Sequence, residues 1–537
     1  MRLADSGRLV HQILADIVDE DPSAPLVDFI TLEGDTASRL SRGDVWQRAQ
    51  RFAWALAASG AARGDRVMTL LGNQPEFLTA FFGISAAGMV SVPLNTASRG
   101  DVLRAALEET EPTVVVTDEA YAPQIADVLD GTPSVTRFVV VGDASIISDP
   151  RSSSYEDFVR DAPLADPVEV ATSDLATLLY TSGTTGRSKG VMCSHNMVVT
   201  WAEAARSCIG NHVEDVAFTC LPIYHGNGLC CTVLPTMLGR GRLAIAPRFS
   251  GTYFWRQVVN SQATTTNLLG AMGAILWRRD PSPLEREHRL RLIMIVPSPV
   301  DHYEEFEERF NLRLTELYGL TDNAIPLVIP HGERRPGSCG LPTEGWQCAV
   351  VNEYDEPVER GEVGELVLRP TKPYAGMSGY YRRPDATVEA WRNLWFHTGD
   401  YVRQDDEGWY YFVDRRKDSI RRGGENISSW EVEQAVLAHS AVLNAAAYGV
   451  DDEIMGHEVM ASVIVQPGEK VEPQELVDQC AERLPRFAVP RYIAVLEAFP
   501  MTETEKVQKA ALRDAGLVPG TWDSREQRYV DAGGSER

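Results

Sequence analysis

The sequence is poor in cysteine, in long apolar runs and in positive charge. Its 537 residues include eight cysteines, none of them spaced as a CxxC pair, so a disulfide scaffold, a zinc motif and a redox motif are not indicated. So few cysteines fit a reducing compartment, and we expect a cytoplasmic protein. No apolar run approaches the ~18 residues that a membrane span requires, so we expect no membrane span. The acidic residues among the first twenty positions do not fit a signal peptide.

The chain is strongly acidic. It contains 51 lysines and arginines against 76 aspartates and glutamates, which gives a formal net charge of −25. Such a field repels a phosphate backbone, and this argues against nucleic acid as a general partner. It does not exclude a small anionic ligand, because backbone amides together with one or two cations bind phosphate inside an acidic protein. The 44% of apolar and 24% of charged residues are typical of a globular fold.

Periodicity in the N-terminal four hundred residues predicts a parallel sheet wrapped by helices. Short apolar runs at Thr113–Thr117, Phe138–Val141 and Leu175–Tyr180 indicate buried strands, and they alternate with longer mixed segments. From about Gly345 the pattern changes to short strands separated by glycine and acidic turns. This second pattern indicates an antiparallel sheet or a small barrel.

The C-terminal part of the chain predicts a separate small α+β domain. A dense cationic turn at 415–426 precedes an amphipathic helix, whose N-cap is Ser428 or Ser429 and whose first turn carries acidic residues. Further strands are expected around 445–450 and 459–465. We therefore place a domain boundary near Lys417.

The strongest local signal is the glycine-rich segment TSGTTGRSKG, which runs from Thr181 to Gly190 directly after a predicted strand. Its glycines allow a tight turn that brings backbone N–H groups close to phosphate oxygens, and its hydroxyls and Lys189 add donors and a positive charge. It is not a Walker A loop, because that motif has Ser or Thr where Gly190 stands. The alternative interpretation is an ordinary flexible surface loop.

Five segments in a fixed order resemble the signatures of the adenylate-forming (AMP-binding) superfamily, which includes acyl-CoA synthetases, adenylation domains of peptide synthetases and beetle luciferases. The order is maintained over roughly 330 residues, so the resemblance is specific, and it extends over nearly the whole chain. Within the superfamily the chain is most similar to carnitine-type and medium-chain acyl-CoA ligases. The segments are YTSGTTGRSKGV (180–191), LYGLTD (317–322), FHTGD (396–400), FVDRRKDSIRRGGENIS (412–428) and PMTETEKVQK (500–509).

The resemblance implies an α/β fold with two domains. Residues 1–416 would form a large ATP- and substrate-binding domain of two doubly wound sheets plus a small β-barrel. Residues 417–537 would form a smaller, mobile α+β domain that carries the catalytic lysine. Lys417 matches the hinge, where rotation of the small domain would exchange Lys506 for the turn at 421–424 between two half-reactions.

The resemblance also implies an ATP-dependent, AMP-forming ligase. A carboxylate would attack the α-phosphate of ATP, giving an acyl adenylate and pyrophosphate, and a thiol, usually that of coenzyme A, would then displace AMP. The small-molecule partners implied are therefore a carboxylic acid, ATP, Mg²⁺ and coenzyme A. Because the first step brings two anions together, catalysis would consist mostly of charge neutralisation and alignment.

The motifs assign residues to each part of this reaction. Thr321 would contact the α-phosphate, and Lys506 would bridge the attacking carboxylate and the α-phosphate. Asp322 stands where the family usually has the glutamate that binds Mg²⁺, and His225 matches the residue beside the acyl pocket. The β- and γ-phosphates would be held by Thr181, Ser182, Gly183, Thr184, Thr185, Gly186 and Lys189.

A second set of residues would bind the nucleoside. Tyr318, with Gly319 beside it, provides a flat face for adenine. Asp400 is suited to accept hydrogen bonds from both ribose hydroxyls, and Arg415 can reach the same sugar. Each of these residues alone has a common structural interpretation, a core aromatic, a turn or a solvated cation, and each gains its functional interpretation from its place in the series.

Three positions depart from the family pattern. Ser188 replaces a proline, which loosens the loop without removing a ligand. Asp322 replaces glutamate, so its carboxylate has a shorter reach, although it could bind Mg²⁺ through a water molecule. Glu505 replaces a glycine and places an acid beside Lys506, where it would favour the charged lysine but repel an incoming carboxylate.

Besides a carboxylate–CoA ligase, a non-catalytic nucleotide-binding or interaction protein and two other activities remain open. In the first of these activities, the acyl group passes to a carrier-protein thiol or to an amine, and coenzyme A does not stimulate turnover. In the second, the enzyme is a diazotase of secondary metabolism, which activates nitrite with ATP and diazotises an aromatic amine.

Overall fold

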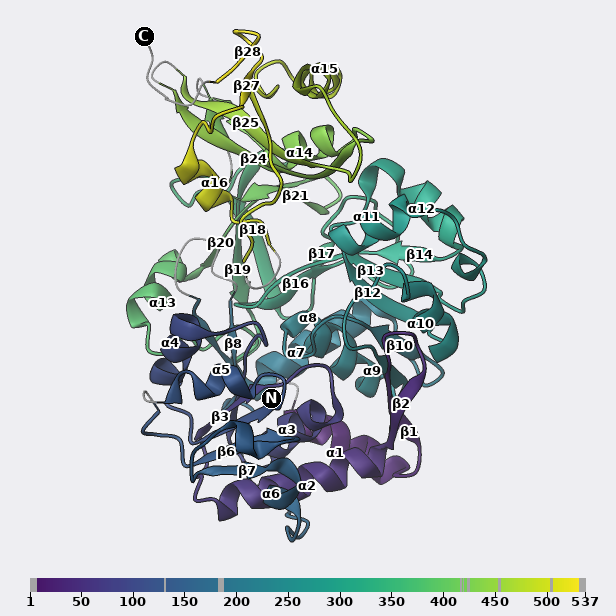
Figure 1. Cartoon of the computed structure of the whole chain (residues 1–537), viewed down its shortest axis with the longest axis vertical. Coiled ribbons are helices and arrows are strands. Elements are labelled where there is room, and N and C mark those ends of the chain that lie inside the picture. The colour runs from purple at the N-terminus through teal and green to yellow at the C-terminus, as the bar shows by residue number, and fades with distance from the viewer. Residues whose placement is uncertain are drawn as a thin grey trace.

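The computed structural model describes residues 7–129, 132–181, 188–415, 418, 420–422, 425–452, 455–502 and 506–530. The N-terminal and middle parts of the chain form a large α/β body, and the chain after β21 lies beyond one end of it (Figure 1). None of the helices in these described ranges is long and apolar enough to cross a membrane.

The first sheet of the large body has seven strands in the order β7-β6-β5-β3-β4-β8-β9. All neighbours are parallel except β8 and β9, which form an antiparallel pair. The predicted strand at Leu175–Tyr180 is confirmed with the same bounds as β8. The strands are β3 (Arg66–Leu70), β4 (Val90–Pro93), β5 (Val114–Asp118), β6 (Arg137–Val141), β7 (Ser152–Ser154), β8 (Leu175–Tyr180) and β9 (Gly190–Ser194).

The second sheet also has seven strands, in the order β14-β13-β12-β10-β11-β1-β2, and only the pairing of β1 with β2 is antiparallel. Parallel strands buried on both faces need near-continuous apolar sequences, and Leu292–Val296 (LIMIV) is an example. The strands are β1 (Pro25–Ile30), β2 (Thr36–Ser41), β10 (Val216–Thr219), β11 (Arg242–Ile245), β12 (Thr265–Leu269), β13 (Leu292–Val296) and β14 (Arg313–Thr315).

The two sheets share one large hydrophobic core with buried helices, among which α3 and α7 bury most of their residues. Ser194 begins α7 by accepting a hydrogen bond from the N–H of Met197, as an N-cap serine does. The helices of the large body are α1 (Val10–Glu20), α2 (Arg42–Ala58), α3 (Pro75–Ala86), α4 (Gly100–Thr110), α5 (Ala122–Ala126), α6 (Tyr155–Val159), α7 (His195–Ile209), α8 (Gly226–Gly228), α9 (Leu234–Leu238), α10 (Phe254–Ser261), α11 (Gly270–Arg278), α12 (Tyr303–Phe310) and α13 (Pro384–Ala390).

The antiparallel pattern expected from about Gly345 is confirmed, but the described residues form open sheets there in place of a closed barrel. Four strands run antiparallel in the order β18-β19-β20-β21, beside a three-stranded sheet β15-β16-β17. The strands are β15 (Leu317–Leu320), β16 (Ala324–Val328), β17 (Leu341–Pro342), β18 (Trp346–Val351), β19 (Val363–Pro370), β20 (Phe396–Gln404) and β21 (Tyr410–Arg415).

The C-terminal part has its own sheet and its own hydrophobic cores, made only of residues after Asp418. Ser428 is the N-cap of α14 and accepts a hydrogen bond from the N–H of Glu431 at 3.2 Å, so one of the two predicted caps is confirmed. The division into 1–416 and 417–537 stays a prediction, because Lys417 lies outside the described residues. The elements are β22 (Ile420–Arg422), β23 (Glu425–Ile427), α14 (Ser429–Leu437), β24 (Val442–Asp452), β25 (Gly456–Val465), α15 (Pro473–Arg483), β26 (Tyr492–Val495), α16 (Lys509–Ala515), β27 (Trp522–Asp523) and β28 (Arg528–Tyr529).

Candidate active site

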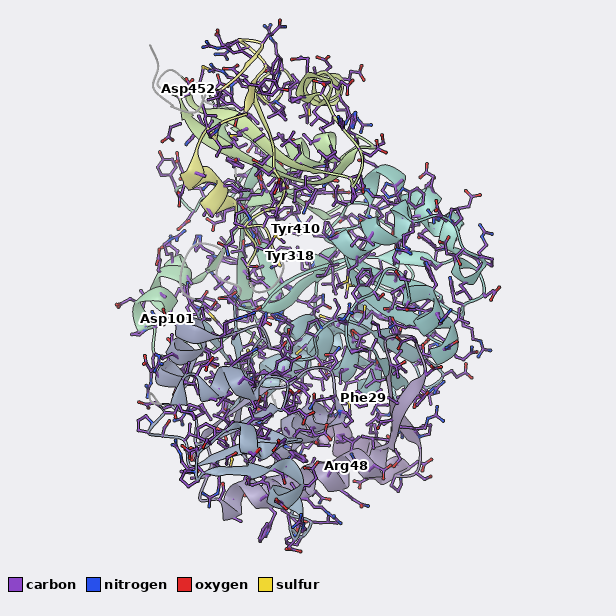
Figure 2. The ribbon with its side chains drawn as sticks, viewed as in Figure 1. Phe29, Arg48, Asp101, Tyr318, Tyr410 and Asp452 are labelled. Atoms are coloured by element: carbon purple, nitrogen blue, oxygen red, sulfur yellow. The ribbon has the colours of Figure 1, made fainter. Side chains whose placement is uncertain are left out.

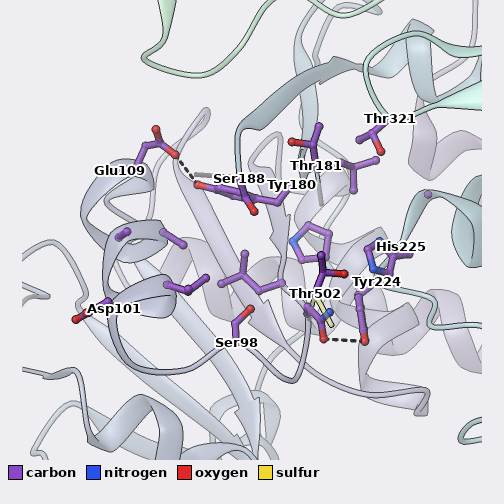
Figure 3. A pocket seen from close by; sticks show the side chains of 18 of the residues that line it. Ser98, Asp101, Glu109, Tyr180, Thr181, Ser188, Tyr224, His225, Thr321 and Thr502 are labelled. Atoms are coloured by element: carbon purple, nitrogen blue, oxygen red, sulfur yellow. Dashed lines mark hydrogen bonds between the residues drawn. The ribbon is translucent and has the colours of Figure 1, made fainter. Parts of the chain in front are cut away.

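A cavity of about 360 Å³ lies where the end of β8, the start of α8 and the turn after β15 meet the C-terminal part of the chain (Figure 3). Thr181, His225 and Thr321 line it from the large body, and Thr502 lines it from the C-terminal part. Thr181 and Thr502, which are 321 positions apart in the sequence, thus share one space. These four residues come from three of the motifs recognised in the sequence, the glycine-rich segment, LYGLTD and PMTETEKVQK, and from the predicted site residue His225.

The glycine-rich loop leaves β8 and returns into β9, and hydrogen bonds close its base. The N–H of Thr181 donates to the carbonyl of Lys189 at 3.0 Å, and the N–H of Lys189 donates to the Thr181 hydroxyl at 3.3 Å. The Lys189 ammonium lies 4.3 Å from the centre of the Tyr380 ring. The predicted phosphate ligands Ser182, Gly183, Thr184, Thr185 and Gly186 lie outside the described residues.

Thr321 and Asp322 occupy the turn between β15 and β16. The Tyr380 hydroxyl donates a hydrogen bond to the Asp322 carboxylate, and the Tyr380 ring faces Lys189, so these three residues form one cluster. Burial raises the pKa of Asp322, while the bond from Tyr380 and the charges of Lys189 and Arg415 act in the opposite direction. Burial therefore disfavours the ionised form of Asp322, and the positive charges of Lys189 and Arg415 partly restore it.

The three residues predicted to bind the nucleoside come together around Asp400. Its carboxylate accepts a hydrogen bond from the Tyr318 hydroxyl at 2.5 Å and pairs with the Arg415 guanidinium at 3.2 Å. The pairing of β20 with β21 sets Asp400 opposite Arg415. Figure 2 places Tyr318 near the middle of the molecule, close to where the C-terminal part meets the large body.

Gly319 allows two backbone segments of the β15–β16 hairpin to lie close together. A β-carbon added at Gly319 would lie 2.8 Å from the carbonyl oxygen of Ala324, which is closer than real β-carbon contacts. Any side chain at this position would push the hairpin apart and displace the neighbouring Tyr318 and Thr321.

Lys506, in the C-terminal part, is joined to Thr502 by two hydrogen bonds. The N–H of Thr502 donates to the Lys506 carbonyl at 2.7 Å, and the Lys506 N–H donates to the Thr502 hydroxyl at 3.0 Å. Burial lowers the pKa of His225 to about 4, and the positive charge of Lys506 acts in the same direction. The lysine is thus within electrostatic range of His225, and the imidazole is neutral at pH 7. Lys417 and Glu505 lie outside the described residues.

Several residues at this site carried no signal in the sequence. Tyr380 belongs to a segment that resembled no motif used above, and its contact with Asp322 spans 58 positions. At the far end of the cavity Glu109 accepts hydrogen bonds from the Tyr180 hydroxyl at 3.0 Å and from Arg383 at 2.8 Å, which ties α4 to the end of β8. Long-range side-chain pairs of this kind leave no local pattern.

The chain is similar in sequence to a known enzyme family and to known proteins. The model of the family described as "AMP-binding enzyme" matches residues 15–381, and that of the "AMP-binding enzyme C-terminal domain" matches residues 431–506. A crotonobetaine/carnitine–CoA ligase of Proteus mirabilis is 30% identical over 491 residues, which cover 88% of this chain and 93% of that protein. The corresponding ligase of Salmonella paratyphi A is 27% identical over 94% of this chain and 99% of its own length.

Solved structures show the same fold. An anthranilate CoA ligase in complex with anthranoyl-AMP superposes with a TM-score of 0.86 and 22% identity over 95% of this chain and 97% of its own. ATP-bound MatB from Rhodopseudomonas palustris superposes with a TM-score of 0.82 and 26% identity over 94% of this chain and 98% of its own. With a family model that covers most of its length and a curated relative at 30% identity, the chain belongs to the AMP-binding enzyme family and is an ATP-dependent, AMP-forming ligase.

Proposed function

We propose that the protein joins a carboxylic acid to coenzyme A through an acyl adenylate. In the first step the carboxylate attacks the α-phosphate of ATP and pyrophosphate leaves. In the second step the thiol of coenzyme A attacks the acyl carbon, and AMP leaves. The observation that carries this proposal is the cavity that Thr181, His225 and Thr321 share with Thr502, which is hydrogen-bonded to Lys506.

The residues around the cavity suit the first step because that step brings two anions together. Lys189, with the glycine-rich loop, would hold the β- and γ-phosphates, and the Thr321 hydroxyl would donate to the α-phosphate. Lys506 would lie between the attacking carboxylate and the α-phosphate and neutralise both. His225 is neutral at pH 7 and would border the acyl group without adding a charge.

The donor set around Asp322 fits Mg²⁺. Its carboxylate oxygens are the ligand type that this ion prefers, and they lie in one cluster with Lys189 and Tyr380. No group of three or more His, Cys, Asp or Glu suited to a metal occurs among the described residues, so phosphate oxygens and water would complete the coordination, as they usually do for Mg²⁺. When bound, Mg²⁺ supplies positive charge to the triphosphate.

The nucleoside would be held by the cluster around Asp400. Both oxygens of this carboxylate already have a partner, the Tyr318 hydroxyl on one and the Arg415 guanidinium on the other, and these contacts fix its orientation for the two ribose hydroxyls. The Tyr318 ring would face adenine. Lys417 would serve as the hinge between the two steps, in line with the family resemblance.

Coenzyme A as the acyl acceptor is supported by the relatives named above, of which the curated ones are CoA ligases. These relatives give no support to a carrier-protein acceptor or to nitrite. A cytoplasmic location stays a prediction, and it is supported by the eight cysteines, all of which are free.

Exchange of labelled pyrophosphate into ATP tests the first step. The assay is run with a panel of fatty, aryl and amino acids and with nitrite, and AMP release is then followed with and without coenzyme A. We expect acid-dependent exchange and AMP release that coenzyme A stimulates. Exchange with nitrite alone, or acid-dependent exchange without any effect of coenzyme A, would support one of the alternatives instead.

Lys506→Ala tests the assignment of the lysine. Losing a charge that contacts the reacting groups should slow exchange ~100-fold or more, while ATP binding is retained. Lys470→Ala is the matched control, because Lys470 is an exposed lysine beside a turn of the same C-terminal part. Equal rates in the two variants would reject the role of Lys506.

A further inference from the structure

Residues 377–381, which we call the bridging segment, join the strand after the glycine-rich loop to the turn that carries Asp322. Two backbone hydrogen bonds of 2.9 Å connect the segment to Met192 on β9, and the N–H of Tyr381 donates to the carbonyl of Gly190 at 2.8 Å. The first N–H of the segment donates to the carbonyl of Asp322 at 3.2 Å. The bridging segment therefore connects the loop strand directly to the turn that carries Asp322.

The side chain of Tyr380, near the end of the bridging segment, contacts both charged groups at once. Its hydroxyl donates to Oδ1 of Asp322, and its ring centre lies 4.3 Å from the ammonium of Lys189. The Tyr380 side chain is buried, and its backbone N–H donates to the Thr387 hydroxyl at 2.9 Å. The backbone hydrogen bond to Thr387 fixes the position of Tyr380. The ring face of Tyr380 then lies against the Lys189 ammonium, and its hydroxyl points to the Asp322 carboxylate.

The hydrogen bond from Tyr380 matters more for the short side chain of Asp322 than it would for glutamate. Aspartate is one C–C bond, ~1.5 Å, shorter than glutamate, so it depends more on the exact aim of its carboxylate. A hydrogen bond on Oδ1 fixes the carboxylate plane and leaves Oδ2 to accept from another group. Groups that hold a ligating carboxylate in this way commonly decide metal affinity.

We propose that Tyr380 is a positioning residue for the metal–nucleotide complex: its hydroxyl aims the Asp322 carboxylate at the metal, and its ring keeps Lys189 beside the phosphates. The proposal rests on the proposed function only in that ATP and Mg²⁺ bind at this site. It requires neither a particular acid nor coenzyme A as the acceptor.

Tyr380→Phe removes the hydroxyl and retains the ring. The readout is the melting temperature of the protein with an ATP analogue whose α- and β-phosphates are joined by a methylene group, titrated with Mg²⁺. We expect the half-saturating Mg²⁺ concentration to rise ~10-fold to 100-fold, as for other groups that hold metal ligands. The stabilisation by the analogue without Mg²⁺ should stay near that of the unmodified protein.

Tyr381→Phe is the matched control, because it removes a hydroxyl from the next residue of the same segment. It should leave the Mg²⁺ titration unchanged. Tyr380→Leu removes the ring as well, and we expect it to raise, in addition, the analogue concentration needed without Mg²⁺, because Lys189 loses the face that holds it. The melting temperature without ligands reports whether each variant is folded.

Asp322→Glu provides a second test that does not depend on the stability of Tyr380→Phe alone. The longer glutamate side chain should reach the metal without a hydrogen bond from Tyr380. Adding Tyr380→Phe to Asp322→Glu should therefore change the half-saturating Mg²⁺ concentration less than 2-fold. The proposal is overturned if Tyr380→Phe leaves the Mg²⁺ titration unchanged, or if its effect is the same with and without the Asp322→Glu substitution. Because only nucleotide and metal are used, a failure here is distinct from a failure to find an acid or an acceptor.

Discussion

Glu316 lies between β14 and β15, two residues before Tyr318, and its carboxyl group is buried, with 7% of the residue exposed. The backbone N–H of Ser298 donates to its Oε2 at 3.2 Å. Burial raises the pKa of Glu316 from 4.5 to about 7, and the hydrogen bonds from Ser298 offset part of this effect. We predict that Glu316→Gln makes the stability of the protein less dependent on pH.

The raised pKa of Glu316 makes the folded protein less stable as the pH rises. Between pH 4.5 and 7 the folded protein binds a proton at Glu316 that the unfolded chain has lost, so the free energy of unfolding falls as the pH rises through this range. A pKa raised from 4.5 to about 7 corresponds to ~3 kcal/mol, at ~1.4 kcal/mol per tenfold change in proton affinity. This contribution is fully present below pH 4.5 and is lost above pH 7. Glutamine keeps an acceptor for Ser298 and has no charge to bury.

Urea denaturation followed by tryptophan fluorescence at pH 5, 6, 7 and 8 measures the effect. The free energy of unfolding of Glu316→Gln should gain ~2–3 kcal/mol relative to the unmodified protein between pH 5 and pH 8. Glu308→Gln, at an exposed glutamate of α12, makes the same change of charge and should show no such gain. Parallel curves for Glu316→Gln and the unmodified protein across this range would refute the reasoning.

Three further outcomes are expected at the candidate active site. Asp400→Asn replaces a charged acceptor that Tyr318 and Arg415 both contact, so the KM for ATP in the pyrophosphate exchange assay should rise ~10-fold or more; an unchanged KM would remove Asp400 from the ribose site. Gly319→Ala should slow exchange and lower the melting temperature, because the new β-carbon would lie 2.8 Å from a backbone oxygen; normal values of both would show that the hairpin adapts. His225, with a pKa of about 4, should not titrate above pH 5.5, so the pH profiles of exchange for His225→Asn and the unmodified protein should run parallel from pH 5.5 to 8.

Local patterns in the sequence predicted much of the fold. The apolar run at Leu175–Tyr180 forms a strand with the predicted bounds, and Ser428 caps the helix expected after the cationic turn. Both features depend on residues that are neighbours along the chain, on a short apolar run in one case and on a hydroxyl three positions from its N–H in the other. The expected small barrel differs because closure depends on how distant strands pair, and here the described strands form open antiparallel sheets.

The family, the glycine-rich segment after a buried strand, and the residues of each motif can be recognised without any coordinates. Only the tertiary structure brought Thr502 to the same cavity as His225 and Thr321, and only it placed Tyr380 against both Asp322 and Lys189. The physical reason is that periodicity reports which face of an element is buried, whereas the pairing of side chains hundreds of positions apart is set by sheet register and by the packing of one part of the chain on another.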